Sequence, residues 1–400
     1  MAELNRQFSG QDKTPPAVRQ RIAQLRKELA ETQERLNQIE KTGKNENGWK
    51  VSEEGHKIVK ELNSLLSQVD QYELRVANGL WGAKEYPFRQ EFLKILETHY
   101  ATGGVASMDF QNDPDAARRK INDWCKQQTN GRITDPLPDG SVSKDTRLVL
   151  ANAIYFLGQW ADPFDMNWTK KADFTLSGKD RVPVPMMHKR SAWTAYAAFN
   201  ADSSFFDTPR MYDPEEKDRS KLYPGDQGFL VAEFPYKGGE IAMMVLVPRS
   251  PEGLGNLEKL LTPDNLRQWF SRLQRRETHV SLPKFKLQTA YEMNDPLKVL
   301  GMVRAFESGK ADFSGMSTGD EPLYLSAVFH KAFVEVNEKG TEAAAFSGIA
   351  TATEAAPPKL EPFIPEFNAD KPFLFLIHDR KTGTILFLGR VEDPRSGEVR

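Results

Sequence analysis

The sequence lacks most features that mark a membrane protein, a nucleic-acid-binding protein or a disulfide scaffold. Its 400 residues include one cysteine, Cys125, which excludes an internal disulfide framework and a cysteine metal site. The net charge of −2 gives no overall attraction to nucleic acid or acidic membranes. The N-terminal residues lack the basic start and apolar run of a secretory signal, and no stretch approaches the roughly 18 apolar residues of a membrane span. We therefore expect neither nucleic acid nor a membrane as a partner.

Catalytic and cofactor motifs are also scarce. There is no HExxH helix motif, no Walker loop and no dinucleotide fingerprint. The histidines are scattered without ligand spacing, at His56, His99, His188, His279, His330 and His378. The sequence therefore predicts a protein that is not an enzyme and holds no metal or cofactor.

Residues 1–71 have the pattern of a helical hairpin. The apolar residues follow an alternating spacing of four and three that only Thr32 interrupts, and the spacing resumes after the polar break TGKNENG. The members are Val18, Ile22, Leu25, Leu29, Leu36 and Ile39, then Ile58, Leu62, Leu65 and Val69. We expect two helices paired antiparallel, either as a packing hairpin or as a coiled coil that binds a partner. We expect this hairpin and residues 72–400 to form one structural domain overall.

From residue 72 to residue 400 strands alternate with helices, which is typical of an α+β fold. The run LVLANAIYFLGQW contains few strongly polar residues and predicts a strand buried on both faces. Other strands are expected at YELRVANGLWG, FLVAEFPY, IAMMVLVP, HVSLPKFKL, PFLFLIHD and TILFLGRV, and helices at 87–100, at AARRKINDWCKQQTNG and around 257–273. Residues 197–227 are rich in Asp, Ser, Pro and Gly, which predicts a polar insertion or a long surface loop.

The most unusual stretch is VNEKGTEAAAFSGIATATEAAP, at residues 336–357. Only about twenty-five residues of hairpin follow it, too few to fold alone, so the stretch must connect parts of one domain. Alternate residues from Thr341 to Thr353 are small or β-branched, while Glu342 and Glu354 fall on the opposite face. The stretch could therefore join a sheet as an extra strand, gaining on the order of 10 kcal/mol of ladder hydrogen bonds.

Several motifs together resemble the serpins, a family of protease inhibitors, in a bacterial-type form. They are Glu338-Lys-Gly-Thr-Glu-Ala-Ala-Ala345, Asn152-Ala-Ile-Tyr-Phe156 with Trp160 and Pro163-Phe164, Val184-Pro-Met-Met187, Leu282-Pro-Lys-Phe285, Ala311-Asp-Phe-Ser-Gly315 and Lys371-Pro-Phe373. They fall in family order between about Tyr72 and Pro394. The resemblance implies an α+β serpin fold, with a large central mixed sheet, further sheets, surrounding helices and a mobile reactive loop at 338–366.

The resemblance also implies a function. A target serine or cysteine protease would cut the loop, which would then insert into the main sheet and trap the protease, with the inhibitor acting as a monomer. The alternatives are a non-inhibitory serpin-like carrier, chaperone or interaction protein, or an inactive truncated serpin.

Residue roles follow from the same resemblance. The loop hinge is Gly340, Thr341, Glu342, Ala343, Ala344 and Ala345, and the scissile bond is Glu354-Ala355, with Lys359 and Leu360 as alternative cut sites. Asn152 and His330 resemble the shutter beneath the point where the sheet parts; each could instead be an ordinary satisfied polar group. Trp160, Lys284 and Glu338 resemble the breach at the top of the sheet, with Lys284 and Glu338 as an ion pair; the alternative is core packing plus a salt bridge.

The N-terminal region departs from the family pattern. Nothing before Tyr72 resembles the first helix, the first strand and the second buried helix of a serpin, so we expect this sequence to begin at an internal methionine of a longer gene. Export to an extracellular or periplasmic space is expected if the true N-terminus carries a signal peptide.

Overall fold

A computed structural model describes residues 72–84, 86–99, 104–129, 131–215, 219–319, 323–338 and 360–395, together with individual positions between 17 and 65. The chain divides into two compact units, Gly10–Glu73 and Leu74–Arg400, with Met1–Ser9 assigned to the second. None of the helices in these described parts is long and apolar enough to cross a membrane.

The smaller unit is helical at every described position between 17 and 35 and between 51 and 65. Two ion pairs join these helical stretches. Arg21 pairs with Glu61 at 2.8 Å, and Arg35 pairs with Glu54 at 3.0 Å. The partner number falls as the arginine number rises, so the two stretches run antiparallel, as the spacing of their apolar residues predicts.

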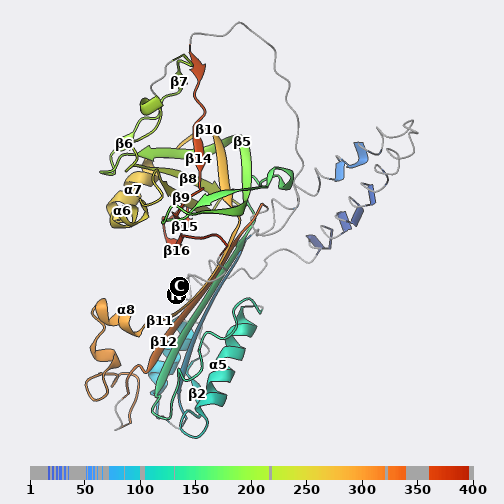
Figure 1. Ribbon diagram of the computed structural model, residues 1–400. Helices are drawn as coiled ribbons and strands as arrows, with labels where there is room; N and C mark the ends of the chain where they lie inside the picture. Colours follow the sequence, from blue (N-terminus) through green and yellow to red (C-terminus); the bar gives the residue numbers. More distant parts are fainter. Residues whose placement is uncertain are drawn as a thin grey trace. The chain divides into compact units, whose positions relative to one another are not determined.

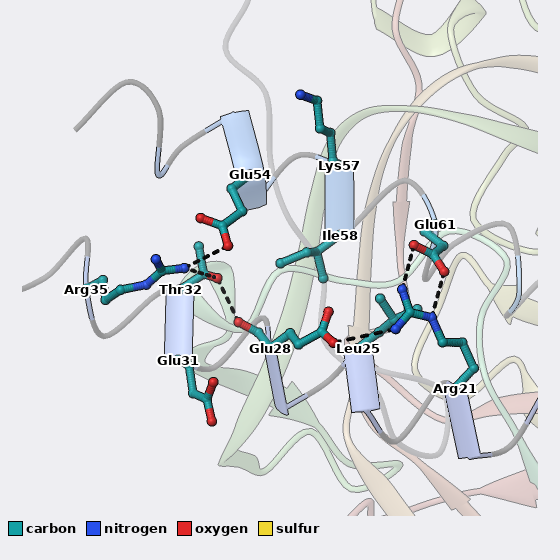
Figure 2. A pocket seen from close by; sticks show the side chains of 10 residues that line it. All are labelled: Arg21, Leu25, Glu28, Glu31, Thr32, Arg35, Glu54, Lys57, Ile58 and Glu61. Carbon is teal, nitrogen blue, oxygen red and sulfur yellow. Dashed lines mark hydrogen bonds and ion pairs between the residues drawn. The ribbon is translucent and has the colours of Figure 1, made fainter. Parts of the chain in front are cut away.

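The residue that interrupts the apolar spacing is accommodated inside this hairpin. Thr32 is buried, and its hydroxyl donates to the carbonyl of Glu28 at 2.7 Å. Leu25 and Ile58 are buried on facing sides of the same hairpin (Figure 2). A threonine fits this apolar position because the preceding turn of its own helix satisfies the hydroxyl.

The larger unit contains a five-stranded mixed sheet (Figure 1). In order across the sheet, its strands are β11 (Phe285–Glu292), β12 (Ala327–Val336), β3 (Leu148–Gly158), β1 (Tyr72–Ala83) and β2 (Ala106–Met108). β11 is antiparallel to β12, whereas β12 and β3 are parallel. β3 is largely buried, which confirms the expected buried strand.

Helix α5 (Pro114–Gln128) lies alongside this sheet and helps to close its core (Figure 1). The Asp113 side chain caps the helix by accepting from the backbone N–H of Ala116 at 2.8 Å, and Gly131 follows its end with a φ of +75°. Ile121 and Cys125 of the helix pack with buried residues of β3 and β12.

A second, nine-stranded sheet completes most of the unit. Its main path is β14 (Glu366–Asn368), β10 (Gln274–Pro283), β5 (Arg181–Phe199), β8 (Phe229–Pro235), β9 (Ile241–Pro248), β15 (Phe373–Asp379) and β16 (Ile385–Val391), and β4 (Lys170–Thr175) and β6 (Phe205–Phe206) also pair with β5. The strands expected at FLVAEFPY and IAMMVLVP pair as the antiparallel hairpin β8–β9, and those expected at PFLFLIHD and TILFLGRV pair as the antiparallel hairpin β15–β16.

The remaining elements are short. β7 (Met211–Tyr212) and β13 (Glu361–Pro362) form a separate two-stranded sheet. The helices are α4 (Gln90–His99), α6 (Leu254–Lys259), α7 (Pro263–Arg272), α8 (Asn294–Val299), η1 (Met166–Trp168), η2 (Arg219–Lys221) and η3 (Arg304–Phe306).

Three local predictions were wrong. The single helix expected around 257–273 is two helices, because Thr262 caps a new helix that begins at Pro263. The strand expected at HVSLPKFKL is the end of β10 and the start of β11, which belong to different sheets and meet at Lys284. The surface loop expected at 197–227 begins inside β5, whose last three residues are buried, and it contains β6 and β7.

Candidate functional site

The centre of the five-stranded sheet is the pair of parallel strands β12 and β3, which we call the central seam. Eight residue pairs align along it. Because the strands are parallel, both finish at the same edge of the sheet, β12 at Val336 and β3 at Gly158. Glu338 therefore lies at the C-terminal end of the central seam, directly before the expected hinge.

Two polar side chains bridge the seam. His330 and Asn152 are register partners, with His330 Nδ1 2.7 Å from Asn152 Oδ1, and Asn152 Nδ2 donates to Asn78 Oδ1 at 2.7 Å. Since the Asn152 amide nitrogen donates to Asn78, its oxygen accepts, and neutral His330 carries its proton on Nδ1. Burial lowers the pKa of His330, which favours this neutral form. The hydrogen bonds thus join β12 to β3 and β3 to β1.

Trp160 closes the C-terminal end of the seam. The side chain is fully buried and stacks on Tyr236, with the ring centroids 4.5 Å apart and the planes 12° from parallel. Its indole N–H donates to the carbonyl of Asn337 at 2.9 Å. Trp160 therefore holds the backbone of the segment that follows β12.

Glu338 is fixed by three neighbours. Its carboxylate lies 3.0 Å from Lys284 Nζ and accepts from the Thr169 hydroxyl at 2.8 Å, while its carbonyl accepts from the Phe164 N–H at 2.8 Å. Burial raises the pKa of the carboxyl, but hydrogen bonds from its own backbone N–H, Lys284 and Thr169 outweigh it, so the pKa lies below the ordinary value. The carboxylate is therefore charged at neutral pH and ties the root of the expected loop to the sheet.

The structure brings the predicted breach residues Trp160, Lys284 and Glu338 together, and it forms the predicted ion pair. It also places Asn152 beside His330. The roles of these residues in parting the sheet stay predictions.

The hinge residues Gly340 to Ala345, the expected scissile bond Glu354-Ala355 and the alternative Lys359 lie outside the described residues. Leu360, the other alternative cut site, is described and 48% exposed.

Residues 315–319 read Gly-Met-Ser-Thr-Gly, which is the spacing of a hydrolase nucleophile elbow. Such an elbow places its serine on a turn between a strand and a helix. Here Ser317 is buried, forms an isolated bridge with Phe88, and donates its hydroxyl to the carbonyl of Pro87 at 3.0 Å. The Ser317 hydroxyl therefore joins two chain segments, and it is not exposed on a strand-to-helix turn as a nucleophile would be.

The described residues offer little other reactive chemistry. Within them, no three side chains of His, Cys, Asp or Glu are grouped to hold a metal ion. Cys125 is buried, and burial raises the pKa of its thiol to about 12, so the reactive thiolate is not populated near neutral pH.

Four residues of the site are not identified by the motifs: Asn78, Thr169, Tyr236 and Asn337. Each contacts a predicted residue, but each lies in a different element or connection, and a lone Asn, Thr or Tyr carries no spacing signal. Tyr236 is the one exception among these four residues. It ends the run FPY beside a predicted strand, and this run indicates an aromatic side chain near a sheet edge.

Comparisons with known proteins extend the resemblance along the chain. A family model described as "Serpin (serine protease inhibitor)" matches residues 24–394, so the match includes part of the helical unit. Human serpin B4 is 40% identical over 341 residues, covering 85% of this chain and 79% of that protein. Human leukocyte elastase inhibitor is 40% identical over 350 residues, covering 86% of this chain and 83% of that protein.

Solved structures agree with this assignment of the fold. The match to uncleaved ovalbumin has a TM-score of 0.66 at 29% sequence identity, and it covers 83% of this chain and 82% of the ovalbumin chain. The match to native protease nexin-1 with heparin has a TM-score of 0.66 at 27% sequence identity, and it covers 84% of this chain and 82% of that chain.

Proposed function

Because this chain belongs to the serpin family, we propose that it inhibits a serine or cysteine protease by presenting residues 338–366 as a loop that the protease cuts. The observation that supports this proposal most is the central seam. β12 and β3 are hydrogen-bonded directly to each other, and Glu338 is held at the end where both strands finish. A segment that turned back from this point would run between the two strands and antiparallel to both.

Insertion would be energetically favourable. Residues 341–354, about 14 residues at about 3.3 Å each, would span roughly 46 Å as a strand. The insertion would replace one parallel ladder with two antiparallel ladders, which are slightly more stable per residue. At about 1 kcal/mol net for each added hydrogen bond, the gain is on the order of 10 kcal/mol. A gain of this size is available only when the loop is free to move at one end.

The order of events would determine the outcome. The protease nucleophile attacks the loop carbonyl and forms an acyl-enzyme, and the amine side of the cut peptide leaves. The acylated side then inserts into the central seam, carrying the protease with it. If insertion is faster than hydrolysis of the acyl bond, the protease is trapped; if it is slower, the inhibitor is simply cut. This chain supplies the bond that is cut, and the protease supplies the nucleophile.

The hinge sequence supports rapid insertion. On the face shared by Thr341, Ala343 and Ala345 there is no charge, and the segment from Gly340 to Ala345 contains no proline. A charge on that face would be buried without a partner, and a proline would remove a ladder hydrogen bond. For the cut itself we propose Glu354-Ala355, with Lys359 or Leu360 as the alternative for a protease of trypsin-like or chymotrypsin-like preference.

The proposal is tested by mixing the protein with a panel of serine and cysteine proteases. We expect a complex with one of them that survives denaturing electrophoresis, because the acyl bond is covalent. Thr341→Arg should abolish this complex and leave a normally cut chain, whereas Glu342→Arg, which changes the opposite face, should retain it. If every protease only cuts the chain, and the cut chain gains no heat stability, the protein is not an inhibitor and the non-inhibitory carrier or chaperone alternative is favoured.

A further inference from the structure

The connection between β5 and β8, residues 200–228, encloses polar side chains that the proposed function does not use. Arg276 of β10 donates hydrogen bonds at 3.1, 2.9 and 3.0 Å to the carbonyls of Thr208, Pro209 and Phe363. The first two of these residues belong to the connection. The Arg276 guanidinium also lies over the ring of Tyr196 on β5, with Cζ 5.9 Å from the ring centroid. Arg276 therefore holds the connection beside Tyr196.

Three buried polar atoms in this region have no hydrogen-bond partner among the described residues. They are the hydroxyl oxygens of Tyr196 and Thr208 and the Nε of Arg249. Tyr196 and Thr208 are only 2% and 7% exposed. Arg249 directly follows β9, and its backbone N–H donates to the carbonyl of Gly228 at the end of the connection, at 2.9 Å. Buried polar groups in folded proteins nearly always have a partner, because burial removes their hydration.

The side chains that carry these atoms lie in one neighbourhood. The Arg249 guanidinium lies over the ring of Tyr223 in the same connection, with Cζ 4.8 Å from the ring centroid. Burial raises the pKa of Tyr196, whereas the Thr208 hydroxyl and the charges of Arg276 and Arg249 act against this rise. The Tyr196 hydroxyl therefore lies close to Thr208 and within the electric field of both guanidinium groups.

This region carries an excess of positive charge. The charged groups that act on its two tyrosines and on Arg276 are Arg210, Arg249, Arg276, Asp207 and Glu366. Three arginines against two carboxylates leave one positive charge. The carbonyls that Arg276 binds are dipoles and do not cancel its charge. Burial lowers the pKa of Arg276, so its surroundings do not fully compensate the cation.

We propose that the hydroxyls of Tyr196 and Thr208 and the Nε–H of Arg249 bind one small anion, of about the size of chloride. Each of the three groups can donate a hydrogen bond, which is what an anion accepts. A water molecule accepts two hydrogen bonds at most and carries no charge, so it would leave the excess positive charge in place. The anion would offset that charge and join β5, the connection and the end of β9. This inference does not depend on inhibition of a protease.

The experiment measures the thermal unfolding midpoint of the full chain in sodium chloride and in sodium gluconate, whose anion is large, at equal ionic strength. Because a ligand that binds only the folded state raises this midpoint, we expect about 150 mM chloride to raise it by at least about 2 °C over gluconate in wild type. Tyr196→Phe, which keeps the ring, and Arg249→Met should each gain less than about a third of this. The matched controls Tyr291→Phe and Arg275→Met change exposed side chains and should gain as much as wild type. Each gain is measured within one variant, so a variant of lower stability still tests the site.

A second readout locates the anion. In crystals grown with bromide in place of chloride, we expect an anomalous scattering peak within hydrogen-bond distance of the Tyr196 hydroxyl in wild type and none there in Arg249→Met. Equal wild-type midpoints in chloride and gluconate would overturn the proposal. A chloride gain that persists in both site variants would place the anion elsewhere and also overturn it. A gain with phosphate but none with chloride would refute the assigned size of the anion.

Discussion

Removing the Asn152 side chain should weaken the central seam by an amount that the structure allows us to calculate. Asn152 Oδ1 accepts from His330 at 2.7 Å, and Asn152 Nδ2 donates to Asn78 at 2.7 Å. In Asn152→Ala, the lost bond to Asn78 costs about 1 kcal/mol, and the His330 N–H deprived of this acceptor costs about 1–3 kcal/mol. Only the bond to His330 crosses between β12 and β3, so the free energy needed to separate these two strands should fall by about 1–3 kcal/mol, or about 5- to 160-fold in the opening equilibrium.

Hydrogen exchange of the uncut protein measures this opening strand by strand. We expect the amides of β12 and β3 to exchange at least about fivefold faster in Asn152→Ala than in wild type. Asn256→Ala is the matched control, because the Asn256 side chain makes an exposed hydrogen bond to Gln227 far along the chain from the seam. Exchange of the seam amides should change less than threefold in the control. If Asn152→Ala behaves like the control, the polar bridge does not hold the strands together.

Three further outcomes follow from the site. Glu338→Gln removes the charge that faces Lys284, and since water can hydrate the partly exposed lysine, we expect a loss of about 1 kcal/mol in urea unfolding, with Lys284→Met giving a similar loss. Burial lowers the pKa of His330 below 6.5, so the unfolded chain takes up a proton first; the unfolding midpoint should therefore decrease as pH falls below 6.5, less steeply in His330→Gln, and equal slopes would contradict this role. Trp160→Phe removes the hydrogen bond to Asn337 and part of the ring stack, and should lower stability by about 1–3 kcal/mol; a thermal midpoint within 1 °C of wild type would refute the contact's importance.

The apolar patterns of the sequence were sufficient for most of the sheet framework. The run around Asn152 is a buried strand, and both apolar hairpins form, because each pattern is local and each strand buries most of its length. The antiparallel pairing of the N-terminal helical stretches also follows from a local spacing. Its interrupting residue, Thr32, is explained only by the hydrogen bond to Glu28.

The errors arose where neighbouring residues enter different parts of the fold. HVSLPKFKL looks like one strand because its apolar alternation continues across Pro283, yet the chain changes sheets at Lys284. The helix around 257–273 divides at Pro263 because Thr262 provides a new cap.

The long-range part of the site could not be predicted from local patterns. The motifs identify Asn152, His330, Lys284 and Glu338, but the bond to Asn78 joins residues 74 positions apart. The contacts of Arg276 with Phe363 likewise span 87 positions. Such pairs leave no periodic signal, because the fold alone brings them together.

The most direct test of the account is to lock the central seam. Ile154 and Ala332 are register partners on β3 and β12, and neighbouring strands lie about 4.8 Å apart, within the reach of a disulfide. In the double variant Ile154→Cys, Ala332→Cys, the oxidised protein should be cut by the target protease without forming a covalent complex, and the cut chain should gain no heat stability. Reduction should restore both properties. If the oxidised and reduced forms trap the protease equally, the strands need not part and insertion into the central seam is not the mechanism.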